Sequence, residues 1–354
     1  MTNVLVNPPK SRRWLRWGGG LLALCLGLVF HIYWTNRQSN AAVERLRKVA
    51  TVHFRETLPY SVIRYIPRHI RRMLPQTLSD VHFQPGTQDF GTHLEGIPVR
   101  GISGIMFVQS EITPQELNGL TRFPNLSDIH FHQCQLADGS LCHLKNLESL
   151  SFRECQLAAG TLRCLKNHPE ITYVAVPNCT LSSTETIDYA SLPHLETLFF
   201  NGSNAGDSVL RGIADHPKIT EIELVGASIT DEGLRKIRRL PSLQKIHLGK
   251  TRVTGVGLAE LDSPLKDLNL AGTLANDEGM AAIARISSLE RLDLARTKIT
   301  VLGVSRLRRL RNLSYLILDR CDIDDEALIH LQAMPQVTRW RAVGTRMVRQ
   351  TTKP

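Results

Sequence analysis

A segment of about 24 residues recurs along most of this chain and constrains its fold more than any other feature. Aligned on the pattern Leu-x-x-Leu-x-Leu, ten successive units start at Ile102, Leu126, Leu147, Ile171, Leu195, Ile219, Leu243, Leu265, Leu289 and Leu313. An incomplete eleventh unit begins at Val337, and Leu78, Val81 and Phe83 match the same pattern upstream. Repeats of this length predict a solenoid, in which each unit packs only against its neighbours.

The unit at residues 219–242 shows what each part of the repeat does. Three alternating apolar residues are expected to point inward around a short strand: Ile219, Ile222 and Leu224. Thr230 can cap a following helix, and Asp231 favours the positive end of that helix. Thr113-Pro114-Gln115-Glu116 is a capping box in an earlier unit. The next apolar residues recur at three-residue spacing and predict one buried helical face: Leu234, Ile237 and Leu240.

These units resemble leucine-rich repeats of the kind L-x-x-L-x-L-x-x-[CT]-x-I-T-D-x-G-L. Such repeats are found in F-box proteins and in planctomycete membrane-anchored proteins, and the resemblance covers about two thirds of the chain. It implies an α/β solenoid, a horseshoe of about ten strand–helix units with its parallel sheet on the concave side. Residues 181–186 and 205–210 lack the ITDxGL pattern, so we expect irregular units there. No F-box-like sequence precedes the repeats, so the resemblance does not extend to an adaptor role in ubiquitin transfer.

The N-terminal region predicts a membrane anchor. After a basic tail (residues 1–16), residues 17–34 read WGGGLLALCLGLVFHIYW without a charged residue. A helix of that length spans roughly 27 Å, and Trp and Tyr at its ends are typical of membrane interfaces. The alternative is a signal peptide cleaved near residues 39–42 (Ser-Asn-Ala-Ala). The basic residues before the span lie closer together than those after it, so we expect a single-pass protein with extracytoplasmic repeats.

A basic connector at residues 35–76 separates this span from the repeats. Its apolar residues recur at helical spacing: Val62, Tyr65, Ile66, Ile70, Met73 and Leu74. They either cap the open end of the solenoid or lie on an anionic membrane surface. Of the net charge of +10, +9 lies in residues 1–100. The solenoid (77–345) and the C-terminal tail (346–354) are nearly neutral, so the basic balance is no evidence for nucleic-acid binding.

The ninth position of the units explains most of the cysteines. It is always small: Ser110, Cys134, Cys155, Cys179, Ser203, Ala227, Thr251, Thr273, Thr297, Cys321 and Thr345. The resemblance places this residue inside the solenoid, so four cysteines are expected to be packing residues. Cys142 and Cys164 fall on predicted helices of neighbouring units. We expect free thiols there, with a bridge between them as the alternative.

The resemblance also places the strand residues that flank the core leucines on the concave side. We take the following as candidate ligand-binding residues: Asp128, His130, His132, Tyr173, Phe199, Glu221, Glu223, Lys245, His247, Asp293 and Tyr315. Exposed aromatic residues on a rigid sheet are typical contact anchors, although they can also simply cover neighbouring strands. His130 and His132 share a strand face, but Cys134 would be a poor third ligand, so we expect no metal site.

The sequence contains no catalytic motif such as a P-loop or a zinc-protease helix, so we expect neither an enzyme nor a cofactor. Basic clusters at 235–239 and 306–311 belong to outer helices and lack the interleaved aromatics that stack on bases. We therefore expect a membrane-anchored module that binds a protein or peptide on its concave sheet, and no nucleic acid. The alternative is a structural or self-assembling envelope component without a discrete ligand.

Overall fold

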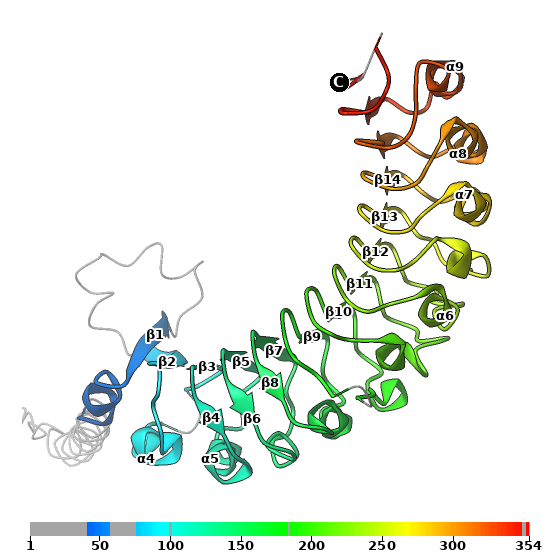
Figure 1. Ribbon diagram of the computed structural model, residues 1–354. Coiled ribbons are helices and arrows are strands. Elements are labelled where there is room, and N and C mark those ends of the chain that lie inside the picture. The colour runs from blue at the N-terminus through cyan, green and yellow to red at the C-terminus, as the bar shows by residue number, and fades with distance from the viewer. Residues whose placement is uncertain (1–40, 57–75, 99–100, 183–184, 349–351, 354) are drawn as a thin grey trace, which may run out of the picture.

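The computed structural model describes residues 41–56, 76–98, 101–182, 185–348 and 352–353. These residues form a curved solenoid with its strands on the concave side and its helices on the outer side (Figure 1). Within them, one sheet of 14 strands runs along the whole arc. It is parallel except at its ends, where β1 pairs antiparallel with β2 and β17 pairs antiparallel with β16. The predicted leucine-rich-repeat type of solenoid with a concave parallel sheet is confirmed.

The strands are short, and neighbours pair one repeat apart, as Leu198, Ile222 and Ile246 do. The main sheet contains β1 (Ala50–Glu56), β2 (Gln76–Phe83), β3 (Gly104–Val108), β5 (Asp128–His132), β7 (Ser149–Arg153), β9 (Tyr173–Ala175), β10 (Thr197–Phe199), β11 (Glu221–Glu223), β12 (Lys245–His247), β13 (Asp267–Asn269), β14 (Arg291–Asp293), β15 (Tyr315–Ile317), β16 (Arg339–Arg341) and β17 (Thr352–Lys353). A second, three-stranded sheet contains β4 (Glu111–Ile112), β6 (Gln135–Leu136) and β8 (Gln156–Leu157).

The outer side is built from short α-helices and 3-10 turns. They are α4 (Phe90–Leu94), α5 (Pro114–Asn118), η1 (Gly119–Arg122), η2 (Thr161–Asn167), η3 (Tyr189–Ser191), η4 (Asp207–Leu210), α6 (Asp231–Leu234), η5 (Val256–Leu258), α7 (Asp277–Ile283), α8 (Val301–Arg306), η6 (Leu307–Arg309) and α9 (Ala327–Gln332). The helix predicted through Leu240 is therefore wrong in length, because α6 ends at Leu234. Ile237 and Leu240 are still buried, so turns satisfy the apolar pattern that suggested a longer helix.

The predicted helix caps are present. Thr113 and Glu116 form the reciprocal hydrogen bonds of a capping box at α5. The Thr230 side chain accepts a hydrogen bond from the backbone N–H of Glu232 at α6. Each cap satisfies a backbone donor that would otherwise lack a partner in the first turn of its helix.

The aspartate beside the cap has a second role that joins successive repeats. The Asp231 carboxylate accepts hydrogen bonds from the backbone N–H of Thr254 at 2.9 Å, from its hydroxyl at 2.8 Å and from the N–H of Gly257 at 2.9 Å. The pairs Asp207–Thr230 and Asp277–Thr300 repeat this arrangement. The glycine of the T-D-x-G-L pattern leaves space for it, because a Cβ on Gly303 would overlap the Asp277 carboxylate.

The core is continuous from one end of the arc to the other. Phe83, Phe107, Phe131 and Phe152 stack in successive repeats with ring centroids 5.2 to 5.5 Å apart. Later repeats place mostly leucine at this position. The ninth residue of each unit is buried from Ser110 to Cys321, which confirms the expected packing role of Cys134, Cys155, Cys179 and Cys321.

Cys142 and Cys164 are joined by a disulfide, so the expectation of free thiols is wrong. Their Cα atoms lie 4.8 Å apart, within the usual range for a bridge. The two cysteines are 22 residues apart in the chain, about the length of one repeat. Neighbouring repeats therefore place them side by side on the outer side of the solenoid, where the bridge links the units that start at Leu126 and Leu147.

Residues 41–56 cover the N-terminal end of the sheet. Residues 41–46 are helical, and Ala42, Val43 and Leu46 are buried against the first repeats. β1 then adds an antiparallel strand outside β2. The apolar stripe at 62–74 and the predicted span at 17–34 lie outside the described residues. In the part of the chain that is described, no helix has the length and apolar character needed to cross a bilayer.

Candidate ligand-binding surface

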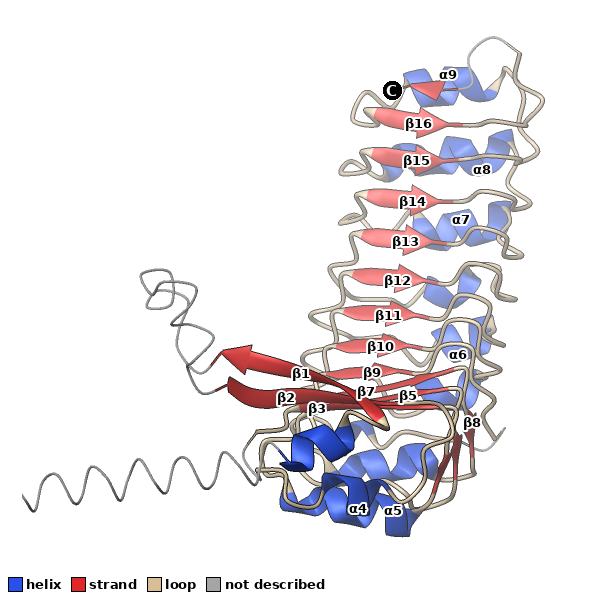
Figure 2. Cartoon of the chain, turned by 90° about the vertical axis from the view of Figure 1, so that its left-hand side faces the viewer, coloured by secondary structure: helices blue, strands red, loops and turns tan. Residues whose placement is uncertain are grey.

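The strands of the concave sheet follow one another like the rungs of a ladder, with the helices behind them (Figure 2). The third and fifth residues of the units project from this face and are mostly half-buried, whereas the residue between them is buried in the core. This alternation follows from the period of two in a strand. The candidate residues therefore share one surface, and they fall into three groups along it.

The first group is an aromatic pair near the middle of the arc. Tyr173 on β9 and Phe199 on β10 lie with their ring centroids 5.6 Å apart and their planes tilted by 45°. Both side chains remain partly accessible. Burial, and then the nearby Glu223 and Glu221 carboxylates, raise the pKa of Tyr173, so its hydroxyl stays protonated and can donate a hydrogen bond at neutral pH. This pair offers a rigid apolar contact with a polar tip.

The second group is a charged network directly beside the aromatic pair. The Lys245 ammonium contacts the Glu221 carboxylate and lies 2.8 Å from Glu223. Burial opposes ionisation of Glu223, but hydrogen bonds from Lys245 and Asn201 hold its pKa below the ordinary value. His247 Nδ1 lies 3.3 Å from the same Glu223 carboxylate. The structure thus brings together four residues that the sequence placed on the surface separately.

The network continues through two residues that were assigned to the concave face but not chosen as ligand-binding residues. Asp267 lies 3.7 Å from His247 Nε2 and 3.3 Å from the Arg291 guanidinium. The pKa of Asp267 is lowered, first by the adjacent His247 side chain. The Arg291 guanidinium then lies 5.2 Å from the ring centroid of Tyr315, in cation–π geometry. Five strands, β11 to β15, therefore share one chain of polar contacts.

Asp293 lies next to this chain on β14. Its carboxylate accepts a hydrogen bond from the backbone N–H of Ala295 at 2.9 Å. Burial raises the pKa of Asp293, and the nearby Asp319 carboxylate adds to the effect. Asp319, which pairs with Arg341, was missed by the sequence analysis because it is the seventh residue of its unit and follows the strand. Continuing the alternation of the third and fifth residues, Tyr315 and Ile317, to the seventh residue would have included Asp319.

The third group, on β5, is separate from the other two. Asp128, His130 and His132 occupy alternate positions of this strand, and β7 and β9 lie between them and Phe199. His132 Nε2 lies 3.9 Å from the Glu154 carboxylate. At the N-terminal edge of the sheet, His53 on β1 and His82 on β2 have ring centroids 4.6 Å apart. Among the described residues, no three His, Cys, Asp or Glu side chains are arranged to hold a metal ion.

Comparison with known proteins supports the fold. No family model and no curated protein matches the chain. Among solved structures, it is similar to the mouse RP105/MD-1 complex (TM-score 0.52, 15% identity, 76% of this chain and 50% of that one). It is also similar to the TLR13–ssRNA13 complex (TM-score 0.52, 15% identity, 72% of this chain and 40% of that one). A third similar structure is the Drosophila Toll–Spätzle complex (TM-score 0.51, 19% identity, 68% of this chain and 33% of that one).

The chain spans half or less of the length of these three structures. At such low identity the likeness concerns the fold. The repeat register, the concave parallel sheet and these neighbours together show that the described part of the chain has the leucine-rich-repeat fold.

Proposed function

We propose that this chain is a membrane-anchored, non-enzymatic module that binds a protein or peptide on its concave sheet. The observation that carries the proposal is the position of the Tyr173–Phe199 pair beside the network of Glu221, Glu223, Lys245 and His247. Protein interfaces commonly combine an aromatic centre with surrounding polar groups in this way. The strands hold both parts rigidly, so little conformational entropy is lost when a partner binds.

The charged network favours a partner with mixed polar groups over a polyanion. Lys245 and His247 are both held beside carboxylates, so neither is a free cation for a phosphate chain. Among the neighbours, the Toll and RP105 structures are complexes with Spätzle and MD-1, whereas the TLR13 structure holds a single-stranded RNA. The fold thus accommodates both kinds of ligand, and the surface of this chain is better suited to a protein.

The anchor and the compartment are part of the same proposal. Ala42 is buried in the N-terminal end of the solenoid, so cleavage after it would remove a packed side chain. This supports retention of the segment at 17–34 as an anchor. The Cys142–Cys164 disulfide supports an extracytoplasmic position for the repeats, because disulfides persist mainly in oxidising compartments.

Site-specific photocrosslinking tests the binding surface. A benzophenone side chain is placed at Phe199 in the full-length chain, and the matched control carries it at Leu302, which is exposed on an outer helix. We expect one partner to be captured from position 199 and not from position 302. The partner, once identified and purified, must bind the unmodified chain and lose affinity at least tenfold with Phe199→Ser.

Two results would reject the proposal. Capture through position 302 alone would assign binding to the outer helices. Recovery only of a second copy of this chain from position 199 would favour the self-assembling structural component.

A further inference from the structure

The structure separates two basic clusters that look alike in the sequence. In the first, at residues 235–239, the cations are paired: Arg235 and Lys236 lie 2.8 and 2.9 Å from Glu232, and Arg239 lies 2.9 Å from Asp215. Arg238 lies 4.0 Å from Glu260. The first cluster is therefore neutralised locally.

The second cluster has a different environment. Arg285, Arg308, Arg309 and Arg311 are exposed, and no carboxylate among the described residues lies within ion-pair distance of them. Arg306 donates to a backbone carbonyl, that of Asp277, instead of a carboxylate. We call these five residues the arginine face. The acids of α7, Asp277 and Glu278, lie in its first turn, whereas Arg285 lies beyond its last residue. The Asp277 carboxylate accepts hydrogen bonds from Thr300.

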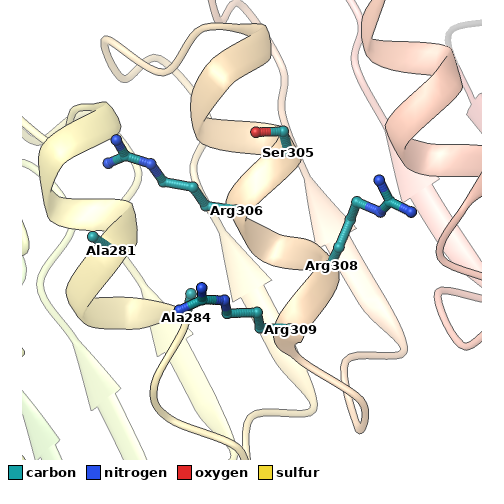
Figure 3. A pocket seen from close by; sticks show the side chains of 6 residues that line it. All are labelled: Ala281, Ala284, Ser305, Arg306, Arg308 and Arg309. Atoms are coloured by element: carbon teal, nitrogen blue, oxygen red, sulfur yellow. The ribbon is translucent and has the colours of Figure 1, made fainter.

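Three residues of the arginine face line a groove between α7 and α8. The groove has a volume of about 520 Å³ and is lined by Ala281, Ala284, Ser305, Arg306, Arg308 and Arg309. Arg306 and Arg309 extend from the second helix toward the two alanines, while Arg308 extends to the opposite side (Figure 3). Because the alanines end at Cβ, an anionic group can approach both guanidinium groups from solvent.

The next outer helix along the arc carries an exposed apolar side chain. Ile329 on α9 is 68% exposed, although most aliphatic residues of the solenoid are buried. It occupies the same position in its repeat as Ala281 and Ser305 occupy in theirs. Exposed aliphatic groups among unpaired arginines are typical of surfaces that meet the headgroup and acyl boundary of a bilayer.

We propose that the arginine face docks onto an anionic phospholipid surface, with the guanidinium groups on lipid phosphates and Ile329 at the acyl boundary. The shape of the molecule agrees with this occupant, because a convex face meets a flat surface over only a few repeats (Figure 1). Together with Ile329, the five residues of the arginine face lie within such a short arc, on three successive repeats. A nucleic acid is less suitable, since α7, α8 and η6 carry no aromatic residue for base stacking. The inference does not depend on what the concave sheet binds.

An environment-sensitive fluorophore on Ile329→Cys provides the test. The four cysteines outside the disulfide in the described residues are buried, and Cys25 is replaced by Ser, so labelling is directed to position 329. The full-length chain is reconstituted into nanodiscs of phosphatidylcholine alone, or of phosphatidylcholine with phosphatidylglycerol. We expect a blue shift of emission only in the anionic discs, and we expect added salt to reverse it, because headgroup attraction is screened.

A pair of charge-matched variants completes the test. Arg308→Gln/Arg309→Gln/Arg311→Gln should abolish the shift, whereas Arg235→Gln/Arg238→Gln/Arg239→Gln removes the same charge from the paired cluster and should retain it. Unchanged thermal melting of both variants excludes unfolding as the cause. An equal shift in neutral discs, an equal loss in both variants, or no shift in any disc would overturn the proposal. So would a shift produced by a single-stranded oligonucleotide and not by anionic lipid.

Discussion

The carboxylate of Asp231 accepts hydrogen bonds from both the backbone nitrogen and the hydroxyl of Thr254, which lies in the following repeat. We expect Asp231→Ala to destabilise the repeat region by about 2 kcal/mol, because it leaves several backbone donors of the next unit without an acceptor. Urea unfolding followed by circular dichroism measures the loss. Asp188→Ala is the control, since the Asp188 side chain makes no cap hydrogen bond. Equal effects of the two changes would mean that Asp231 does not link the repeats.

A second prediction concerns the glycine that lets the outer segments approach each other. A Cβ on Gly279 would overlap the carbonyl oxygen of Thr254. Gly279→Ala should therefore destabilise the fold by about 2 kcal/mol, as overpacking against a rigid backbone does. Gly206→Ala is the matched change, because the nearest atom to its added Cβ is 4.0 Å away. If thermal melting shows both variants to be equally stable, the close approach is not a constraint.

The disulfide gives a third prediction. Replacing both Cys142 and Cys164 by Ser should lower the free energy of unfolding by about 3 kcal/mol, because the bridge closes a loop of roughly 20 residues in the unfolded chain. Reductant should lower the melting temperature of the native chain and leave the double variant unchanged. In cells, these two thiols should resist alkylation until a reductant is added. Full alkylation without reductant would contradict both the bridge and the proposed extracytoplasmic position.

A fourth prediction follows from His168, which is completely buried with Nε2 3.3 Å from the Leu141 carbonyl oxygen. Burial lowers its pKa to about 4. The unfolded state therefore binds a proton at higher pH than the folded state, and stability falls as the pH drops from 6.5 to 4. The loss over this window is about 3 kcal/mol. His168→Gln should remove this component of the pH dependence, measured as urea midpoints between pH 7.5 and 5. Parallel pH profiles would show that His168 titrates normally.

The fifth prediction concerns the network on the concave sheet. Lys245→Gln removes the cation that pairs with Glu223, so the pKa of Glu223 should rise. Carbon-13 NMR titration of the labelled carboxylate measures the change. The stability change should stay below about 1 kcal/mol, because the pair is partly exposed to solvent. Lys266→Gln serves as the control, since Lys266 pairs with the exposed Glu290. If Glu223 titrates identically in both variants, Lys245 does not control its charge.

The sequence predicts the repeat register, the concave side and the ninth-position packing, because each rests on a side-chain period that burial enforces. It does not predict which concave residues touch. Lys245 could have remained free, and only the register of β11 and β12 places it opposite Glu221. The disulfide remained only the alternative for the same reason, since its cysteines meet only after the exact stacking of two units of different length. The backbone at the eighth residue of the units is also only partly predictable. It has a positive φ in Gly226 and Gly272, where glycine signals that conformation. It has the same sign of φ in Lys250 and Arg296, where the residue type gives no such signal.

The antiparallel strands at the two ends of the main sheet have a consequence for assembly. A further leucine-rich repeat stacks by adding a parallel strand in repeat register, but β1 and β17 run antiparallel to the strands beside them. At both edges of the described sheet the repeat pattern is therefore broken, so another solenoid cannot stack there simply as one more repeat. Within the described residues, the run of parallel strands that a partner can follow in repeat register extends from β2 to β16.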